Sequence, residues 1–347
     1  MEYNFLPTTN IKVSKICLGT MTWGRQNTTQ EAFDQMNFSL EHGVNFFDTA
    51  ELYPVPATAD KYAVTEEIIG KWFYENKNRE KIILATKIAG PGAYTAHIRK
   101  TGFKGKSIDE AVDGSLKRLK TDYIDLYQLH WPNRGSYHFR SYWNYKPEKQ
   151  DSKNITDEFL DIINTLNDLK KEGLIRAIGV SNETCWGVMK LNEIIKDIEN
   201  LCIASIQNEY SLMCRLFDND FNELSINENI PLLAYSPLAR GLLTGKYIGN
   251  KIPEGSRLSR DDKIRKIVNE NSDLAVKSYC SLASKYNIDP IHMSLAFCHE
   301  RPFMGSVIFG ATDITQLKKI LAGINLKLDS EINDEIQILY KKFPLTF

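Results

Sequence analysis

The chain has 347 residues, of which 42% are hydrophobic and 25% are charged, a composition typical of a protein with a sizeable core and a water-exposed surface. The formal net charge of −1 at pH 7 argues against a nucleic-acid surface or an anionic-membrane anchor. No apolar stretch approaches the roughly 20 residues that span a bilayer, the first residues lack a secretory pattern, and six scattered cysteines without a Cys-x-x-Cys pair indicate reduced thiols in the cytoplasm.

Strand-like and helix-like segments alternate along the chain. Residues 3–6 and 12–14 predict a β-hairpin that turns at residues 8–10. Eight later segments have the length and composition of strands: residues 16–20, 45–49, 82–87, 123–130, 175–181, 204–208, 231–236 and 307–310. Amphipathic segments typical of helices lie between or after them: residues 29–42, 65–75, 108–119, 157–171, 185–195, 217–227, 273–286 and 314–321.

This alternation predicts a parallel sheet, because parallel neighbours need a crossover between them. An open doubly wound sheet is the rival architecture, and it usually carries Gly-x-Gly-x-x-Gly after an early strand. Residues 18–24, Leu-Gly-Thr-Met-Thr-Trp-Gly, lack that spacing. We therefore predict a (β/α)₈ TIM barrel that occupies residues 1–347 as one domain.

Two connections are unusually long for a compact domain. Residues 89–106 follow the third predicted barrel strand, and residues 133–153 follow the fourth and are rich in aromatic side chains. Long loops often act as lids or binding walls, although aromatic residues in a surface excursion can also pack on the barrel rim. Both loops leave strand ends that carry polar residues, which favours a lid or substrate wall.

Four of these polar residues form a set with a shared chemistry. Asp48, Tyr53, Lys87 and His130 follow successive predicted strands at the carboxyl end, where α/β proteins bind ligands. Each alone is more often a structural residue, but together they can transfer one proton beside a carbonyl group. The spacing of Cys and His predicts no metal site.

The chemistry assigns a role to each member of the set. A free phenol has a pKa near 10, so Tyr53 needs help to act as an acid, and an adjacent Lys87 ammonium is expected to lower that pKa. Asp48 can hold Lys87 in its charged form, and His130 can orient the carbonyl oxygen. A reduction also needs a hydride, which a nicotinamide supplies.

At this point the sequence resembles the aldo-keto reductase family. Residues 48–53 (Asp-Thr-Ala-Glu-Leu-Tyr) resemble the family's Asp-x-Ala-x-x-Tyr, residues 82–87 its lysine strand and residues 129–132 its histidine motif. Further matches continue downstream to the end of the barrel. The most similar branch is the Tas-like one, which is itself similar to the β subunits of voltage-gated potassium channels. These downstream matches are residues 178–182, 206–210, 235–246 and 309–312.

The resemblance implies NADP(H) as cofactor and a set of residues that bind it. In the family, the matching Asn and Gln hold the nicotinamide amide, an aromatic residue stacks on its ring, and the segment after it wraps the pyrophosphate. Two positions depart from the pattern, because Ile320 stands where many members carry Asn, and Lys319 stands where an acid is common and could attract a 2′-phosphate. The implied cofactor residues are Gly19, Thr20, Met21, Asp48, Ser181, Asn182, Gln207, Tyr235, Ser236, Leu238, Arg240, Gly241, Lys246, Arg257, Gly310, Thr312 and Gln316.

Two functions follow from these observations. The first is reduction of aldehydes or ketones with NADPH, in a pocket lined by Trp23, Tyr53, His130 and Trp131. The second is an NADP(H)-binding redox sensor or regulatory subunit with little turnover, which alone would need a protein partner. Neither reading involves nucleic acid or a membrane.

Overall fold

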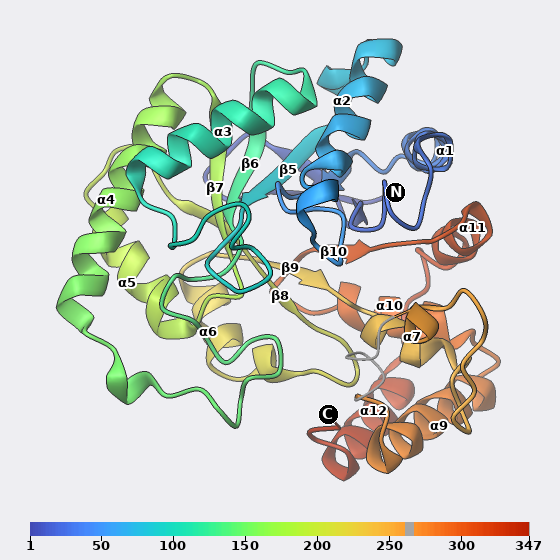
Figure 1. The fold of residues 1–347 in the computed structure, drawn as a ribbon. Coiled ribbons are helices and arrows are strands. Elements are labelled where there is room, and N and C mark those ends of the chain that lie inside the picture. Colours follow the sequence, from blue (N-terminus) through green and yellow to red (C-terminus); the bar gives the residue numbers. More distant parts are fainter. Residues whose placement is uncertain (261–266, 347) are drawn as a thin grey trace.

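A closed barrel of eight parallel strands forms the centre of the computed structural model, which describes residues 1–260 and 267–346 (Figure 1). Around the barrel the order is β10-β3-β4-β5-β6-β7-β8-β9. The predicted (β/α)₈ barrel is therefore confirmed. The strands are β3 (Ile16–Gly19), β4 (Phe46–Asp48), β5 (Ile83–Ile88), β6 (Ile124–Leu129), β7 (Ile175–Ser181), β8 (Ile203–Glu209), β9 (Leu232–Tyr235) and β10 (Met304–Phe309).

Helices surround the barrel and bury an apolar face against it (Figure 1). Several of them begin at capping side chains, such as Thr28, whose hydroxyl accepts from the backbone N–H of Glu31, and Asp151. The helices are α1 (Thr29–Glu41), α2 (Val64–Asn76), α3 (Gly105–Leu119), α4 (Ser152–Lys171), α5 (Cys185–Ile195), α6 (Asp220–Asn227), α7 (Arg257–Arg260), α9 (Glu270–Lys285), α10 (Pro290–His299), α11 (Ile314–Ala322) and α12 (Ser330–Lys342).

Three of these helices, the single-turn α7 and the longer α10 and α12, were not among the predicted elements. Nearly every side chain of α10 from Ile291 to Cys298 is buried, so it lacks the polar face that marks an amphipathic helix. Helix α12 comes after the last barrel strand and α11, outside the strand–helix alternation that guided the prediction.

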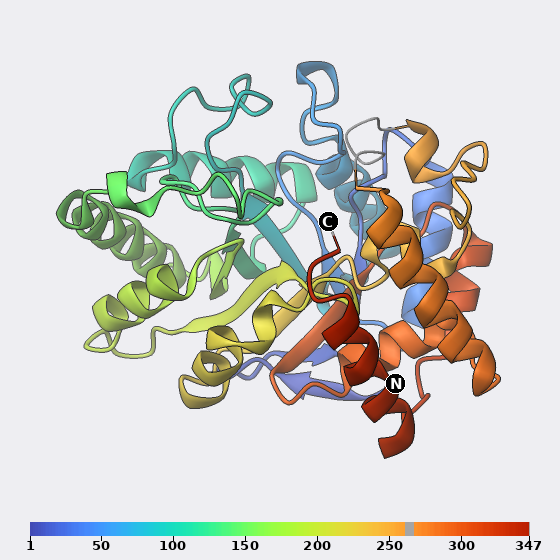
Figure 2. The same cartoon turned by 90° about the horizontal axis from the view of Figure 1, so that it is seen from below.

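The predicted N-terminal hairpin is present and closes one end of the barrel. Strand β1 (Tyr3–Phe5) pairs with β2 (Lys12–Ser14) in antiparallel register. Leu6 and Val13 are fully buried in one cluster with barrel-interior side chains such as Phe46 and Leu126. Figure 2 shows the hairpin at one end of the barrel and the long loops at the other. The hairpin therefore covers the end of the barrel opposite to the carboxyl ends of the strands.

Candidate active site

The structure brings the four predicted catalytic residues together at the carboxyl end of the barrel. Asp48 is the last residue of β4, Lys87 lies near the end of β5, and His130 directly follows β6. Tyr53 lies in the segment after β4, and its ring meets that of His130 edge-on with centroids 5.8 Å apart. The Lys87 ammonium lies 5.1 Å from the centre of the Tyr53 ring. The phenol of Tyr53, the ammonium of Lys87 and the imidazole of His130 thus lie close together at the carboxyl end of the barrel.

A buried ion pair forms the base of this site. The Lys87 ammonium donates to an Asp48 oxygen at 2.6 Å and to the backbone carbonyl of Thr49 at 2.7 Å, and its side chain has no exposed surface. Burial lowers the pKa of Lys87, but Asp48 and Tyr53 raise it by more, so the net pKa shift is upward. The lysine is therefore held as a cation.

Two glutamines complete the hydrogen bonding of Asp48. The side-chain amide of Gln207 donates to the second Asp48 oxygen at 2.9 Å, and that of Gln128 donates to it at 3.2 Å. Sequence reasoning predicted Gln207 only as a cofactor contact and did not include Gln128. The sequence position of Gln128 could have indicated it. Side chains alternate along a strand, and Gln128 lies two residues before His130, so it shares a face of β6 with that position.

Burial decides the protonation of Tyr53. Desolvation raises the pKa of the phenol by more than Lys87 lowers it, and Asp48 raises it further. Lys87 lowers the pKa of Tyr53 as expected, but burial outweighs it, so the net shift of the pKa is upward. The phenol stays protonated near neutral pH and is available as a proton donor.

His130 is a neutral imidazole in this environment. Burial and the neighbouring Lys87 hold its pKa well below the usual 6.5. Its Nδ1 is buried and has no hydrogen-bond partner within the described part of the chain. A neutral ring can donate one hydrogen bond to a carbonyl oxygen without bringing a second positive charge next to Lys87.

A second hydrogen-bonded group lies beside these residues at the ends of β7, β8 and β9. The Asn182 amide donates to the His130 carbonyl at 3.0 Å, and its oxygen accepts from the Tyr235 hydroxyl at 2.7 Å. The Ser181 hydroxyl donates to the Gln207 carbonyl at 2.8 Å. These four predicted cofactor residues therefore form one connected group next to the candidate catalytic residues.

The segment after β9 forms a turn with unusual backbone angles. Ser236, Ala239, Arg240 and Gly241 all have positive φ, and the backbone N–H of Gly241 donates to the Leu238 carbonyl at 2.8 Å. Successive residues of this kind can form anion-binding concavities.

Cationic side chains surround this turn. Lys246 is exposed and lies close to Gly241, and the charge of Arg257 reaches far enough to lower the pKa of Tyr53 slightly. Arg240 instead forms an ion pair with Glu209. The turn thus combines an anion-binding backbone shape with positive charge, which suits a phosphate group.

The remaining predicted cofactor residues lie near the ends of β3 and β10. A Cβ atom on Gly19 would lie 3.0 Å from the Phe309 carbonyl, and the Thr20 hydroxyl donates to the Asp48 carbonyl at 3.0 Å. The Met21 carbonyl accepts from the backbone N–H of Val55 at 3.0 Å. Gly310 is exposed directly after β10.

The predicted adenosine end lies at the start of α11. The Gln316 amide donates to the Thr312 hydroxyl at 2.9 Å, and Gln316 is exposed. Ile320 lies on the buried face of α11 and packs in the core rather than at the surface. Lys319 pairs with Asp289 at 2.9 Å, which satisfies its charge without a phosphate.

Aromatic side chains from both long loops form a wall beside His130. The Trp131 ring lies 4.9 Å from the His130 ring, 5.7 Å from Tyr94 and 6.0 Å from Phe139. Tyr94 and Phe139 are about half exposed. Phe139 belongs to the aromatic loop that was expected to form a substrate wall, whereas Tyr94 was not singled out from the sequence.

Trp23, in contrast, does not reach this wall. Its side chain is fully buried in the core between the barrel and the helices, and its indole donates to Gln35 of α1 at 3.2 Å. The predicted pocket therefore keeps Tyr53, His130 and Trp131 but not Trp23.

This barrel and this group of residues define an oxidoreductase family. The family model described as "Aldo/keto reductase family" matches residues 15–341, and the chain belongs to that family. The predicted resemblance is thereby confirmed.

Several known proteins are similar along nearly their whole length. "Protein tas" of Escherichia coli (strain K12) is 36% identical over 345 residues, which cover 99% of each chain. "Aldo-keto reductase YhdN" of Bacillus subtilis (strain 168) is 29% identical over 346 residues, 98% of this chain and 93% of the relative. A "Probable voltage-gated potassium channel subunit beta" of Arabidopsis thaliana is 29% identical over 338 residues, 94% of this chain and 92% of the relative.

The helices and the possible metal-ligating side chains of residues 1–260 and 267–346 bear on other functions. None of their helices is both long and apolar enough to cross a membrane. Within the same ranges, His, Cys, Asp and Glu side chains form no group of three or more that could hold a metal ion.

Proposed function

We propose that the chain reduces aldehydes or ketones to alcohols with NADPH, and that Tyr53 donates the proton. The observation that carries this proposal is the buried Lys87–Asp48 pair beside a protonated phenol and a neutral imidazole. A group of this composition stabilises negative charge as it develops on a carbonyl oxygen.

Each side chain has a task that follows from its surroundings. His130 and Tyr53 hold the carbonyl oxygen by hydrogen bonds, and the phenol gives up its proton as that oxygen gains charge. The Lys87 ammonium stabilises the phenolate that results, and Asp48 keeps the ammonium in place. Trp131 and the rings of Tyr94 and Phe139 exclude water from one side of the pocket.

The residues around the site fit a nicotinamide dinucleotide. Asn182 and Gln207 offer side-chain amides, and Tyr235 offers a partly exposed ring at the end of β9. The positive-φ turn at residues 236–241, which contains Arg240 and has Lys246 beside it, would hold the phosphates. When bound, the nicotinamide supplies the hydride.

The preference for the 2′-phosphorylated cofactor rests on positive charge. Lys319 is engaged by Asp289. We assign the 2′-phosphate to the exposed Lys246 and, as the resemblance implies, to Arg257. The six cysteines all lie in the described part of the chain and are free, which supports a cytoplasmic site of action as part of the proposal.

The test is NADPH oxidation by the purified protein across a broad panel of aldehydes and ketones, with Tyr53→Phe beside it. We expect the variant to lose about 10²- to 10⁴-fold in kcat while it still binds NADPH. Tyr74→Phe is the matched control, because Tyr74 is an exposed phenol on α2. Equal turnover by wild type and Tyr53→Phe would refute the role of Tyr53.

The same experiment distinguishes the second function. The potassium channel subunit among the relatives supports a regulatory role that depends on a protein partner. Tight NADPH binding without turnover on any carbonyl would favour that role, and a partner would then be sought by affinity capture with the NADPH-bound chain.

A further inference from the structure

Glu209 joins two segments that are far apart in the sequence. One of its oxygens accepts from Arg140 at 2.9 Å, in the long loop after β6, and the other lies 3.7 Å from Arg240, in the turn after β9. All three side chains are largely buried. A single carboxylate at the end of β8 thus connects the loop at the candidate substrate pocket with the turn proposed to hold phosphate.

The loop has a strained backbone where this contact is made. Phe139 and Arg140 have φ values of 57° and 67°, in the left-handed region that is unfavourable for a non-glycine residue. Such a conformation persists when neighbouring contacts hold it. Arg140 binds Glu209, and the ring of Phe139 packs edge-on against Trp131. The conformation therefore couples the ion pair to the wall of the candidate pocket.

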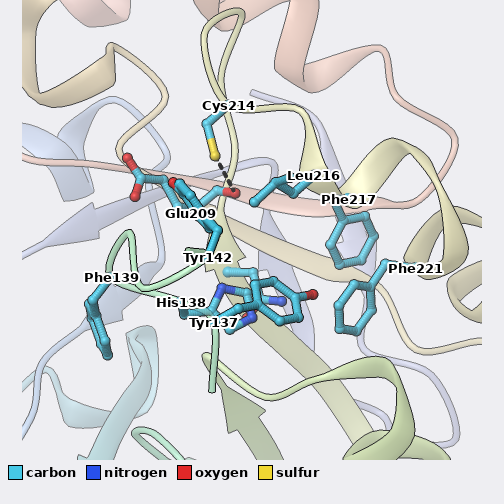
Figure 3. Close-up of a pocket in the computed structure, with 10 residues that line it drawn as sticks. Tyr137, His138, Phe139, Tyr142, Glu209, Cys214, Leu216, Phe217 and Phe221 are labelled. Atoms are coloured by element: carbon cyan, nitrogen blue, oxygen red, sulfur yellow. Dashed lines mark hydrogen bonds between the residues drawn. The ribbon is translucent and has the colours of Figure 1, made fainter. Parts of the chain in front are cut away.

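Packing between this part of the loop and the barrel is incomplete, although His138 is buried and hydrogen-bonded to the Glu183 carbonyl at 2.9 Å. A hollow lies beneath it, with Tyr137 and Tyr142 of the loop on one side and Asn208 of β8 on the other. Asn208 is 2% exposed, and its amide makes no hydrogen bond to any described residue. Figure 3 shows Tyr137 turned toward Phe217 and Phe221, whereas Phe139 points away from them. The loop can therefore shift when the charges at Glu209 change.

An anion at the turn would change those charges. Two guanidinium groups that share one carboxylate repel each other, which weakens the hold of Glu209 on Arg140. A diphosphate near Arg240 would draw that arginine toward itself and leave Glu209 to Arg140 alone. We propose that Glu209 is a positioning residue, through which cofactor binding at Arg240 tightens the loop at residues 133–151 over the substrate pocket. This inference rests on the proposed binding of NADP(H).

Hydrogen exchange of the full-length protein tests the inference. Backbone amides of residues 137–145 are followed with and without saturating NADPH, whose binding is measured separately by fluorescence titration. In the wild type we expect NADPH to slow exchange by about fivefold or more, the lower end of usual allosteric couplings. Glu209→Gln and Arg140→Met should bind NADPH without this slowing. Lys146→Met, an exposed cation on the same loop, should respond like the wild type.

Two further readouts separate coupling from general loosening of the structure. Arg240→Met removes the competing guanidinium, so the loop should exchange slowly even without NADPH. Arg140→Met should raise the carbonyl KM about fivefold or more with little change in kcat, because the loop contributes to substrate binding and not to the chemical step.

Three results would overturn the inference. The first is unchanged loop exchange when NADPH is shown to bind the wild type. The second is a full NADPH response in Glu209→Gln. The third is an absence of NADPH binding to the wild type, which would also refute the proposed function and is recognised from the titration alone.

Discussion

The ammonium of Lys87 and the carboxylate of Asp48 form a fully enclosed ion pair in which every acceptor position has a donor. One Asp48 oxygen faces Lys87 at 2.6 Å, and the other accepts from Gln128 and Gln207. Charges are costly to bury unless they are paired and hydrogen-bonded in this way. The pair is therefore important for stability as well as for the proposed chemistry.

Lys87→Met should destabilise the protein by about 3–5 kcal/mol, because it leaves Asp48 buried without its partner. The double variant Asp48→Asn with Lys87→Met should lose less than the sum of the two single losses. Urea unfolding measures all three variants. Lys71→Met is the control, since its pair with Glu75 is exposed and contributes below about 1 kcal/mol. Equal effects of the Lys87 and Lys71 substitutions would contradict this prediction.

The rate of reduction should not depend on pH near neutrality. Burial raises the pKa of Tyr53 above its usual value of 10 and lowers that of His130 well below 6.5, so both groups stay neutral between those limits. We expect kcat/KM for a carbonyl to be flat from about pH 7 to about pH 9. A profile with a limb centred near pH 7 to 8 in the free enzyme would show that the pKa of one group lies elsewhere.

Acid should weaken the fold through His138. Burial lowers the pKa of this histidine to about 4, whereas in the unfolded chain it is near 6.5. Between these values the unfolded state binds more protons, so the free energy of unfolding falls as pH falls from about 6.5 to about 4, by up to about 3 kcal/mol.

Urea unfolding at several pH values tests this prediction. His138→Gln should make the dependence over that range less steep, while His130, whose pKa burial also lowers, still contributes to it. His42→Gln, at an exposed histidine, should leave the slope unchanged. An unchanged slope in His138→Gln would mean that this imidazole is not the group that titrates.

Trp131 should control selectivity for aromatic substrates. Its ring lies among those of His130, Tyr94 and Phe139, and aromatic pairs contribute about 0.5–1.5 kcal/mol beyond the area they bury. For Trp131→Leu we expect kcat/KM for a benzaldehyde to fall up to about tenfold relative to that for a short aliphatic aldehyde. Trp186→Leu, at a partly exposed tryptophan on α5, is the control. A ratio that does not change would exclude Trp131 from the substrate wall.

Strand positions were predictable from the sequence because barrel strands are short apolar runs followed by polar residues. That rule located Asp48, Lys87 and His130 at the correct end of the barrel before their distances were known. The fold class followed from the alternation of strands and helices, and the N-terminal hairpin from two short strand-like segments on either side of a turn. The single-domain organisation and the functional roles of the site residues stay predictions.

Relations between distant segments were not predictable in this way. Trp23 follows β3 as the pocket hypothesis requires, yet its indole turns into the core toward Gln35. Lys319 has the charge to attract a phosphate but lies within reach of Asp289. The pKa of Tyr53 rises because the effect of burial exceeds that of Lys87, and the depth of burial cannot be read from the sequence. The direction of a side chain and its depth are tertiary properties.

The hairpin at the amino end of the barrel limits how protons can pass between the candidate site and water. Leu6, Ile11 and Val13 seal the interior from below, and they are almost fully withdrawn from solvent. The Lys87 side chain has no exposed surface, so under the proposed function a carbonyl compound seated at the carboxyl ends of the strands would separate the site from water. The proton that Tyr53 donates would then be replaced after the product alcohol has left, and reprotonation of the phenol would be linked to product release.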